Sequence, residues 1–341
     1  MKFTLSWLKD HLETQASLNQ ICEKLPMLGL EVESIQDRSD ELSEFIVGYV
    51  EEAYQHPNAD RLRVCIVDTG SEKVQVVCGA PNARTGIKGV FAPAGARIPS
   101  TGDELKKGVI RGEASNGMLC SEREMGISDE HDGIIELPSD SKIGEGFAKI
   151  AGFDDPIIDI AITPDRADCL GVRGIARDLA AAGLGKLKPL DTSPVKTTFK
   201  SPIDWRVDLP DMDPPLAPLV VGRYFKGVKN GPSPKWLKER LQAVGLRPIS
   251  ALVDITNYVM MDVGRPLHAY DADKVEGDIF IRLAKNGEKY TALDGKEYVF
   301  DEEMIVIGDD RGVDDLAGIM GGERSGCGDG TVNMFLEAAI F

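Results

Sequence analysis

Two patterns of hydrophobic and polar positions alternate along the chain. Residues 1–30 and 160–187 carry apolar side chains three and four positions apart, which is typical of amphipathic helices. Between about residues 44 and 140 the apolar runs are short, as in FIVGYVEEAY and RLRVCIVDTG, and Gly, Pro and Asn separate them. These runs predict about five strands, enough for a small barrel, and the OB-fold is the class that fits best. The pattern therefore predicts a helical region that a barrel interrupts.

Capping residues predict where several helices begin and end. Ser6 is expected to cap WLKDHL, and Ser17 with Gln20 forms a capping-box pattern before the next helix. Asp168 is expected to cap the helix in CLGVRGIARDLAAAGLG, and Gly183 to end it.

The last third of the chain mixes helices and strands. Helices are predicted after Ser233 and from Ser250 towards Met261, and FIRLAKNGEKYTALDGKEYVF predicts three strands with tight turns at Asn286-Gly287 and Asp294-Gly295. The fold class is multidomain α+β. The expected domains are an N-terminal domain in two halves (1–39 and 152–187), an inserted OB-fold module (40–151), a Pro/Thr/Lys-rich linker (188–204) and an α+β domain (205–341).

Composition narrows the class of protein. A length of 341 residues implies two or three domains, and the six cysteines include no CxxC pair. The first residues turn charged too early for a secretory signal, and no apolar stretch is long enough to span a membrane. Reduced thiols in a cytoplasmic protein are therefore expected. The net charge of −17 argues against a protein that grips nucleic acid mainly through its phosphates.

The barrel region carries the first distinctive motifs. Alone, HPNADRLRVCIVDTG predicts a loop, a helical turn and a strand, with His56 exposed. VVCGAPNARTGIKGVFAPAGARIP and GVIRGEASNGMLCSEREMGI follow it in order. Together these strings resemble the tRNA-binding OB-fold module of the phenylalanyl-tRNA synthetase beta subunit family (bacterial type), and the chain resembles that subunit's N-terminal portion.

Local charge limits what this module can do. Residues 40–151 carry 12 basic and 19 acidic side chains, a balance of −7. The basic group that could contact tRNA weakly is small, and a solvated face is the alternative interpretation. Its members are Arg61, Arg63, Lys106, Lys107 and Arg111.

The segments on both sides of the barrel extend the resemblance. MKFTLSWLKDHL with LPMLGLEVESI, and DIAITPDRADCLGVRGIARDLAA, are similar to the two halves of that subunit's N-terminal domain. Asp165 and Asp168 could suggest a metal site, but they are better interpreted as turn and N-cap carboxylates. No metal site is predicted.

The carboxy-terminal third resembles the family's editing domain, through ALVDITNYVMMDVGRPLHAYDADKV and DLAGIMGGERSGCGDGTVNMFLEAAIF. GIMGGERSG is rich in glycine but lacks the Gly-Lys-Ser/Thr of a phosphate-binding loop, so a nucleotide-binding interpretation is rejected. The resemblance implies a glycine-lined pocket for an aromatic amino acid esterified to tRNA. The pocket positions that it implies are Thr256, Asn257, Pro266, Leu293, Ala317 and Gly318 for substrate binding, with His268 and Glu337 as the catalytic pair.

The resemblance also gives the pair its roles. A lone histidine is commonly structural, and a zinc site is not expected because no second His or Cys lies near His268 in sequence. In the family, a carboxylate at the position of Glu337 reads the hydroxyl of tyrosine. His268, with Asn257 and backbone groups, would orient the ester and the attacking water. A pocket that binds phenylalanine discriminates only weakly against the added hydroxyl of tyrosine, which makes a second, hydroxyl-reading site useful.

The expected function is thus the beta-subunit part of a phenylalanine–tRNA ligase, with an editing site for tyrosyl-tRNA(Phe). The resemblance implies an alpha-subunit partner in an alpha2beta2 enzyme, tRNA(Phe), and ATP and Mg²⁺ for the complete enzyme. No cofactor is expected in this stretch, which ends inside the editing domain and is not expected to aminoacylate. The alternative from another class is a non-catalytic tRNA-binding or assembly module. A structural scaffold for the alpha subunit is a third interpretation.

Overall fold

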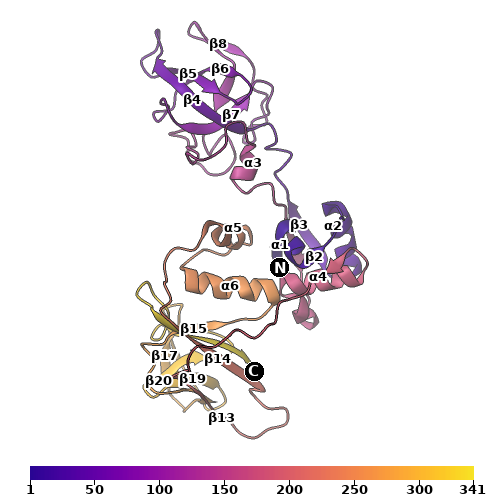
Figure 1. Ribbon diagram of the computed structural model, residues 1–341, viewed down its shortest axis with the longest axis vertical. Helices are drawn as coiled ribbons and strands as arrows, with labels where there is room; N and C mark the ends of the chain where they lie inside the picture. Colours follow the sequence, from indigo (N-terminus) through magenta and orange to yellow (C-terminus); the bar gives the residue numbers. More distant parts are fainter. The chain divides into compact units, whose positions relative to one another are not determined.

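The computed structural model describes residues 1–341 and divides into two compact units (Figure 1). One unit is Ile35–Ile157, and the other joins Met1–Ser34 to Ile158–Phe341. The multidomain α+β organisation predicted from the sequence is confirmed. None of its helices is long and apolar enough to cross a lipid bilayer.

The unit Ile35–Ile157 is built on a five-stranded antiparallel sheet. Its order is β10-β7-β4-β5-β6, and the Asn116 N–H donates to the Gln75 carbonyl at 2.9 Å, so the sheet curls until its two edges nearly meet. Only a glycine fits at position 117 of β10, because a Cβ there would lie 2.5 Å from the ring of Phe91 on the neighbouring strand β7. The elements are β4 (Ile46–Gln55), β5 (Arg63–Asp68), β6 (Lys73–Cys78), β7 (Lys88–Pro93), the hairpin β8 (Gly108–Ile110) and β9 (Glu113–Ser115), β10 (Gly117–Leu119) and α3 (Phe147–Ile150).

The first segment of the other unit shares one hydrophobic core with residues 158–187. Trp7, Leu8, Ile175 and Leu179 are fully buried in it, so residues far apart in sequence stabilise each other. The elements are β1 (Lys2–Thr4), α1 (Leu5–His11), β2 (Leu12–Glu13), α2 (Leu18–Met27), β3 (Glu31–Gln36), β11 (Ile157–Ala161), the 3-10 helix η1 (Pro164–Cys169), α4 (Val172–Ala181) and β12 (Lys186–Leu187).

Three predicted helix boundaries have different outcomes. The capping box of Ser17 and Gln20 is confirmed at the start of α2. The other two predicted caps are wrong. Thr4, not Ser6, accepts the Trp7 N–H at the start of α1. Asp168 lies in the 3-10 helix before α4 and pairs with arginines, so Gly171 takes the N-cap position without a side-chain cap.

Helices α5 (Lys235–Ala243) and α6 (Ala251–Val263) lie side by side (Figure 1) and pack on this same core. The rings of Trp7 and Tyr258 stack with their centroids 5.1 Å apart. The indole N–H of Trp7 donates to the Asp262 carboxylate at 2.7 Å. Helix α6 is therefore held on the side of the N-terminal helices by aromatic and polar contacts.

The remaining strands form two main sheets. A four-stranded sheet has the order β13-β16-β19-β20, and a three-stranded sheet has the order β14-β21-β15. Gly287 and Gly295 have positive φ values of 80° and 75°, so the chain turns at both predicted sites. The hairpin predicted at Asp294-Gly295 is confirmed, because it joins the antiparallel strands β17 and β18. The hairpin predicted at Asn286-Gly287 is wrong, because β16 pairs with β13 and β19 and not with β17. The strands are β13 (Trp205–Asp208), β14 (Leu219–Lys226), β15 (His268–Asp271), β16 (Ile279–Leu283), β17 (Lys289–Thr291), β18 (Glu297–Val299), β19 (Ile305–Asp309), β20 (Gly312–Leu316) and β21 (Asn333–Ile340).

Candidate active site

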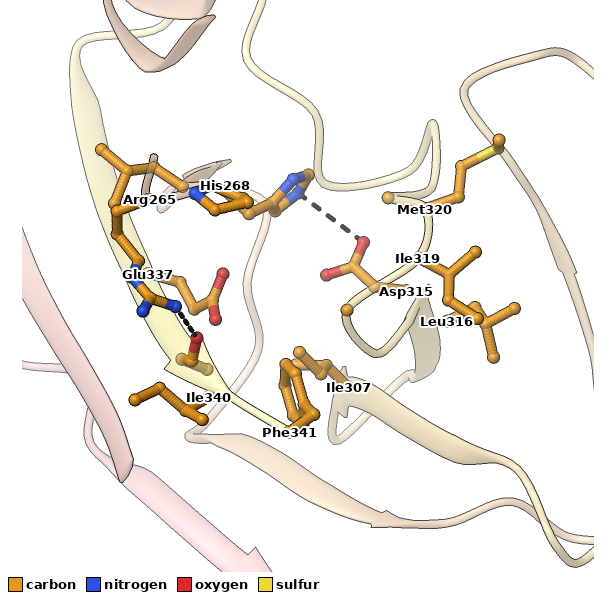
Figure 2. A pocket seen from close by; sticks show the side chains of 15 residues that line it. Arg265, His268, Ile307, Asp315, Leu316, Ile319, Met320, Glu337, Ile340 and Phe341 are labelled. Carbon is orange, nitrogen blue, oxygen red and sulfur yellow. Dashed lines mark hydrogen bonds and ion pairs between the residues drawn. The ribbon is translucent and has the colours of Figure 1, made fainter. Parts of the chain in front are cut away.

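A pocket opens where the ends of the two sheets meet. On the three-stranded sheet, Glu337 of the central strand β21 lies directly opposite His268 of β15. Cross-strand partners project from the same face of a sheet. Both side chains line a pocket of about 370 Å³, and Asp315 of β20 lines it from the other sheet (Figure 2).

The turn that follows α6 positions His268 at this pocket. Gly264 caps the helix in the left-handed conformation with φ 72°, and its N–H donates to the Met260 carbonyl at 2.9 Å. Pro266 follows, where a helix cannot continue, and β15 begins two residues later. A glycine is also required at position 171, because a Cβ there would lie 2.2 Å from the Gly264 nitrogen.

Two glycines of the GIMGG segment shape the pocket wall. A Cβ on Gly321 would lie 2.3 Å from Cε1 of His268, so the imidazole rests directly on the backbone. Gly318 has φ 69°, and a Cβ there would lie 2.9 Å from the Phe341 ring. Small residues therefore let side chains from other strands approach this segment.

Asp315 is the centre of a buried polar group. Its Oδ2 accepts a hydrogen bond from the Tyr270 hydroxyl, and its Oδ1 accepts the Gly322 N–H at 2.9 Å. The same Oδ1 lies 3.6 Å from Nε2 of His268 (Figure 2). Burial and the neighbouring Asp315 carboxylate raise the pKa of Tyr270 well above its usual range, so the phenol stays a hydrogen-bond donor.

Glu337 has the strongly perturbed carboxyl group of the pocket. Burial, and then the charge of Asp315, raise its pKa from 4.5 to about 7, while a hydrogen bond from the His268 backbone opposes the shift. The group therefore changes protonation near neutral pH. A carboxyl group in this state can accept a hydrogen bond from a ligand hydroxyl when ionised and donate one when protonated.

Comparisons with known proteins show which proteins the chain is similar to. Residues 216–341 match the model of the B3/4 domain, and residues 45–146 match that of the putative tRNA binding domain. The chain is 55% identical over 341 residues to the phenylalanine–tRNA ligase beta subunit of Paramagnetospirillum magneticum, and 56% identical over 348 aligned residues to that of Cereibacter sphaeroides. The chain is homologous to phenylalanine–tRNA ligase beta subunits along its whole length. It spans 43% of the length of each of these two relatives.

Solved structures give weaker likenesses. An N-terminal fragment of the phenylalanyl-tRNA synthetase beta subunit from Pyrococcus horikoshii is 15% identical, with a TM-score of 0.33 over 55% of this chain and 56% of that one. A MetRS related protein from the same organism is 25% identical, with a TM-score of 0.23 over 30% of this chain and 86% of that one.

The structure brings together half of the expected pocket residues. Pro266, His268, Gly318 and Glu337 line the pocket. The other four lie outside its lining, and their role in substrate binding stays a prediction. They are Thr256, Asn257, Leu293 and Ala317.

Local contacts explain why three of these four face elsewhere. Thr256 donates its hydroxyl to the Val253 carbonyl at 2.7 Å, as threonines inside helices often do. Leu293 sits in the tight turn after β17 and is 58% exposed. Ala317 packs against the hydrophobic core that residues of both sheets form.

Sequence reasoning missed three residues that the structure adds. Asp315 and Arg265 line the pocket, and Tyr270 anchors Asp315. Arg265 donates to the Ala339 carbonyl at 3.1 Å on β21. Their positions were the available signal: Tyr270 is part of PLHAY, Arg265 directly precedes that motif, and Asp315 directly precedes LAGIMGG.

The five basic residues expected to contact tRNA are all exposed. His56 is buried, contrary to the expectation of an exposed loop residue. Its Nε2 lies 3.0 Å from the Ile110 carbonyl, and Asn58 donates to the Arg111 carbonyl at 3.1 Å. These contacts tie the β8–β9 hairpin, which carries Arg111, to the loop that leads into Arg61 and Arg63.

The group formed by Asp168, Cys169 and Asp178 has the spacing of a metal site, but arginines occupy it. Arg166 pairs with Asp168 at 3.1 Å and donates to the Cys169 sulfur at 2.8 Å, and Arg177 also pairs with Asp168. Arg166 and then Arg177 hold the pKa of Asp168 well below its usual range. The carboxylates of Asp168 and Asp178 are therefore part of an ion-pair network with Arg166 and Arg177.

Proposed function

We propose that the chain carries the editing site of a phenylalanine–tRNA ligase and hydrolyses tyrosyl-tRNA(Phe). The observation that carries the proposal is the direct pairing of His268 and Glu337 across two strands at the wall of one pocket. The homology to phenylalanine–tRNA ligase beta subunits supplies the substrate class.

In this proposal Glu337 recognises the phenol hydroxyl of the mischarged amino acid. Because the carboxyl group is buried, a phenylalanyl ester would leave it without a partner, whereas a tyrosyl ester supplies one. A site of this kind can discriminate by roughly 10⁴-fold between ligands that have the hydroxyl and ligands that lack it.

His268 acts at the ester end of the same pocket. We assign to it the orientation of the attacking water and the acceptance of its proton, with Gly318, Gly321 and Pro266 shaping the surface that the ester lies on. Asn257 and Thr256 remain candidate contacts for the ester.

The proposal also covers the rest of the chain. We assign the nearly closed sheet to an OB-fold module (residues 40–151) inserted between two halves of an N-terminal domain (1–39 and 152–187), with 188–204 as linker and 205–341 as the editing domain. The module would contact tRNA(Phe) weakly through its five exposed basic residues. An alpha-subunit partner, a cytoplasmic location, and ATP and Mg²⁺ belong to the proposal for the complete ligase, and no residue here is assigned to ATP or Mg²⁺.

The rival candidate is a tRNA-binding or assembly module without catalysis. The putative tRNA binding domain matched at residues 45–146 favours it. Two assays on the chain separate the candidates: filter binding of deacylated tRNA(Phe), and release of tyrosine from tyrosyl-tRNA(Phe). We expect the chain to release tyrosine faster than the spontaneous rate. His268→Ala should abolish this release but retain tRNA binding. Tight tRNA binding with release only at the spontaneous rate supports the rival.

A further inference from the structure

Asp315 differs in its partners from Asp309 and Asp314, the two buried aspartates closest to it in sequence. Arg324 pairs with Asp309 at 2.6 Å and with Asp314 at 2.5 Å, so these two carboxylates share one arginine as their counter-charge. Asp315 has no such neighbour, and the only ion-pairing group within reach is His268. A buried carboxylate without a counter-charge is costly, so this arrangement needs a compensating role.

Two hydrogen bonds fix the carboxylate itself. The Tyr270 hydroxyl donates to Oδ2, and the Gly322 N–H donates to Oδ1 at 2.9 Å. The two donors come from different segments, the strand β15 and the glycine segment. Asp315 is thereby held with one oxygen directed at the imidazole.

The imidazole is enclosed from three sides. It rests on the Gly321 backbone, and the Tyr270 ring meets it edge-on with centroids 4.5 Å apart. Nε2 of His268 is buried without a hydrogen-bond partner, and Asp315 faces it at 3.6 Å. The side chain as a whole keeps 23% exposure. A small movement of the ring would close the gap, and such contacts commonly tighten when substrate binds.

We propose that Asp315 is a positioning residue that holds His268 with its Nε2–H directed at the carboxylate. Nδ1 is then the ring nitrogen with a free lone pair. This inference rests on the proposed function, because it assigns Nδ1 as the base in ester hydrolysis. A carboxylate that selects the tautomer of a histidine base is a recurrent device of hydrolytic sites.

The hydrolytic step balances with water alone. The water oxygen attacks the ester carbonyl carbon, and Nδ1 takes the water proton. The tetrahedral intermediate then collapses, the bond from the carbonyl carbon to the ribose oxygen breaks, and the imidazolium returns the proton to that oxygen. Free amino acid and tRNA with an intact terminal hydroxyl are the products.

The first test reads the tautomer directly, without substrate. The chain contains only four histidines, so the ¹⁵N resonances of His268 in a [¹⁵N]histidine-labelled sample can be assigned by comparison with His268→Gln. At a pH where the ring is neutral, we expect Nε2 protonated and Nδ1 unprotonated. In Asp315→Asn, whose amide can donate to Nε2, the Nδ1 resonance should move towards the protonated position. Unchanged His268 resonances in Asp315→Asn overturn the proposal.

Asp314→Asn is the matched control. Asp314 is the adjacent buried carboxylate of the same strand, but it pairs with Arg324 rather than facing His268. We expect its His268 resonances to match those of the unaltered chain. An equal shift in both variants would mean that general disturbance of β20 moves the ring, and would overturn a specific role for Asp315.

The second test measures hydrolysis of tyrosyl-tRNA(Phe). A positioned general base contributes about 10²- to 10⁴-fold, so Asp315→Asn should lower kcat by at least about 10-fold with little change in KM. Gly321→Ala should have a similar effect by displacing the ring. If Asp315→Asn fails to fold by circular dichroism, Tyr270→Phe keeps the ring and removes only the hydroxyl, with an expected loss of about two- to fivefold.

The outcomes of the two tests separate this inference from the proposed function. If the unaltered chain hydrolyses no ester while the His268 tautomer depends on Asp315, the proposed function fails and the positioning role stands. If the chain hydrolyses tyrosyl-tRNA(Phe) and Asp315→Asn retains both its rate and its tautomer, the positioning role is wrong and the proposed function stands.

Discussion

The barrel unit (Ile35–Ile157) and the carboxy-terminal part of the chain (residues 205–341, called the pocket region below) place their acidic groups differently. Residues 40–151 contain 19 acidic side chains, yet no carboxylate of that unit is buried. All the buried carboxylates of the chain lie in the pocket region, at Asp254, Asp271, Asp309, Asp314, Asp315 and Glu337.

Because only the pocket region buries carboxylates, the two regions are suited to different chemistry. Charged groups on a barrel surface are solvated and screened, so they can support only weak, salt-dependent contacts. A buried carboxylate has a fixed direction and little solvent screening, and burial raises the pKa of Glu337; these are properties that catalysis and selective recognition need. Four of the six lie outside the pocket lining, whereas Asp315 and Glu337 line it.

The largest expected effect is on catalysis in the pocket region. His268→Ala should lower the hydrolysis of tyrosyl- and phenylalanyl-tRNA(Phe) alike by about 10²- to 10⁴-fold, because a positioned base serves both esters. Single-turnover release of labelled amino acid measures it. The matched control is His131→Ala in the barrel unit, an exposed histidine whose loss should leave the rate unchanged. Equal rates for His268→Ala and His131→Ala would return His268 to a structural role.

The next effect is on selectivity. Glu337→Ala should reduce the preference for tyrosyl over phenylalanyl esters by about 100-fold, since only the contact to the hydroxyl is removed. The measurement is the ratio of single-turnover rates for the two esters. A variant that slows both esters equally, with the ratio intact, would contradict a hydroxyl-reading role.

Glu337 should also make stability depend on pH. Its folded pKa of about 7 lies above the ordinary value of 4.5, so ionisation disfavours the folded state as pH rises through this interval. At one pKa unit per 1.36 kcal/mol, Glu337→Gln should gain about 3 kcal/mol relative to the unaltered chain between pH 4.5 and pH 8. Urea unfolding at the two pH values measures this. A pH-independent difference would show that the carboxyl group titrates normally.

The smallest effect is expected on the barrel surface. Replacing Lys106, Lys107 and Arg111 together by alanine should weaken tRNA(Phe) binding only a few-fold, from an affinity already in the range of about 10⁻⁴ to 10⁻⁶ M. The slope of affinity against salt concentration should fall as well. Filter binding at several salt concentrations measures both, and a steep loss of a nanomolar affinity would favour the binding-module interpretation.

Local signals made much of the fold predictable from sequence. The capping box at Ser17 and the turns at Gly287 and Gly295 depend on neighbouring residues alone, so the pattern locates them. The cap predicted at Asp168 was wrong because long side chains of Arg166 and Arg177 compete for its carboxylate, which a local pattern does not register.

The candidate site was predictable only in part for a related reason. The family resemblance marked His268 and Glu337 as a pair, and the register of β15 on β21 places them opposite one another. The position of Asp315 beside LAGIMGG was a signal that it lies near the site. Its contact with His268 depends on the pairing of β19 with β20 and on the packing of the two sheets, which the local sequence does not show. Burial of a single aspartate is likewise a property of the folded chain.

The central claim is that this pocket distinguishes tyrosine from phenylalanine on the same tRNA. The most direct measurement is the single-turnover hydrolysis of tyrosyl-tRNA(Phe) and phenylalanyl-tRNA(Phe) by the unaltered chain, under identical conditions near pH 7. We predict that tyrosyl-tRNA(Phe) is hydrolysed faster by at least about 100-fold, because only its hydroxyl satisfies the buried carboxyl group of Glu337. Equal rates for the two esters, or no rate above spontaneous hydrolysis for either, would contradict the account.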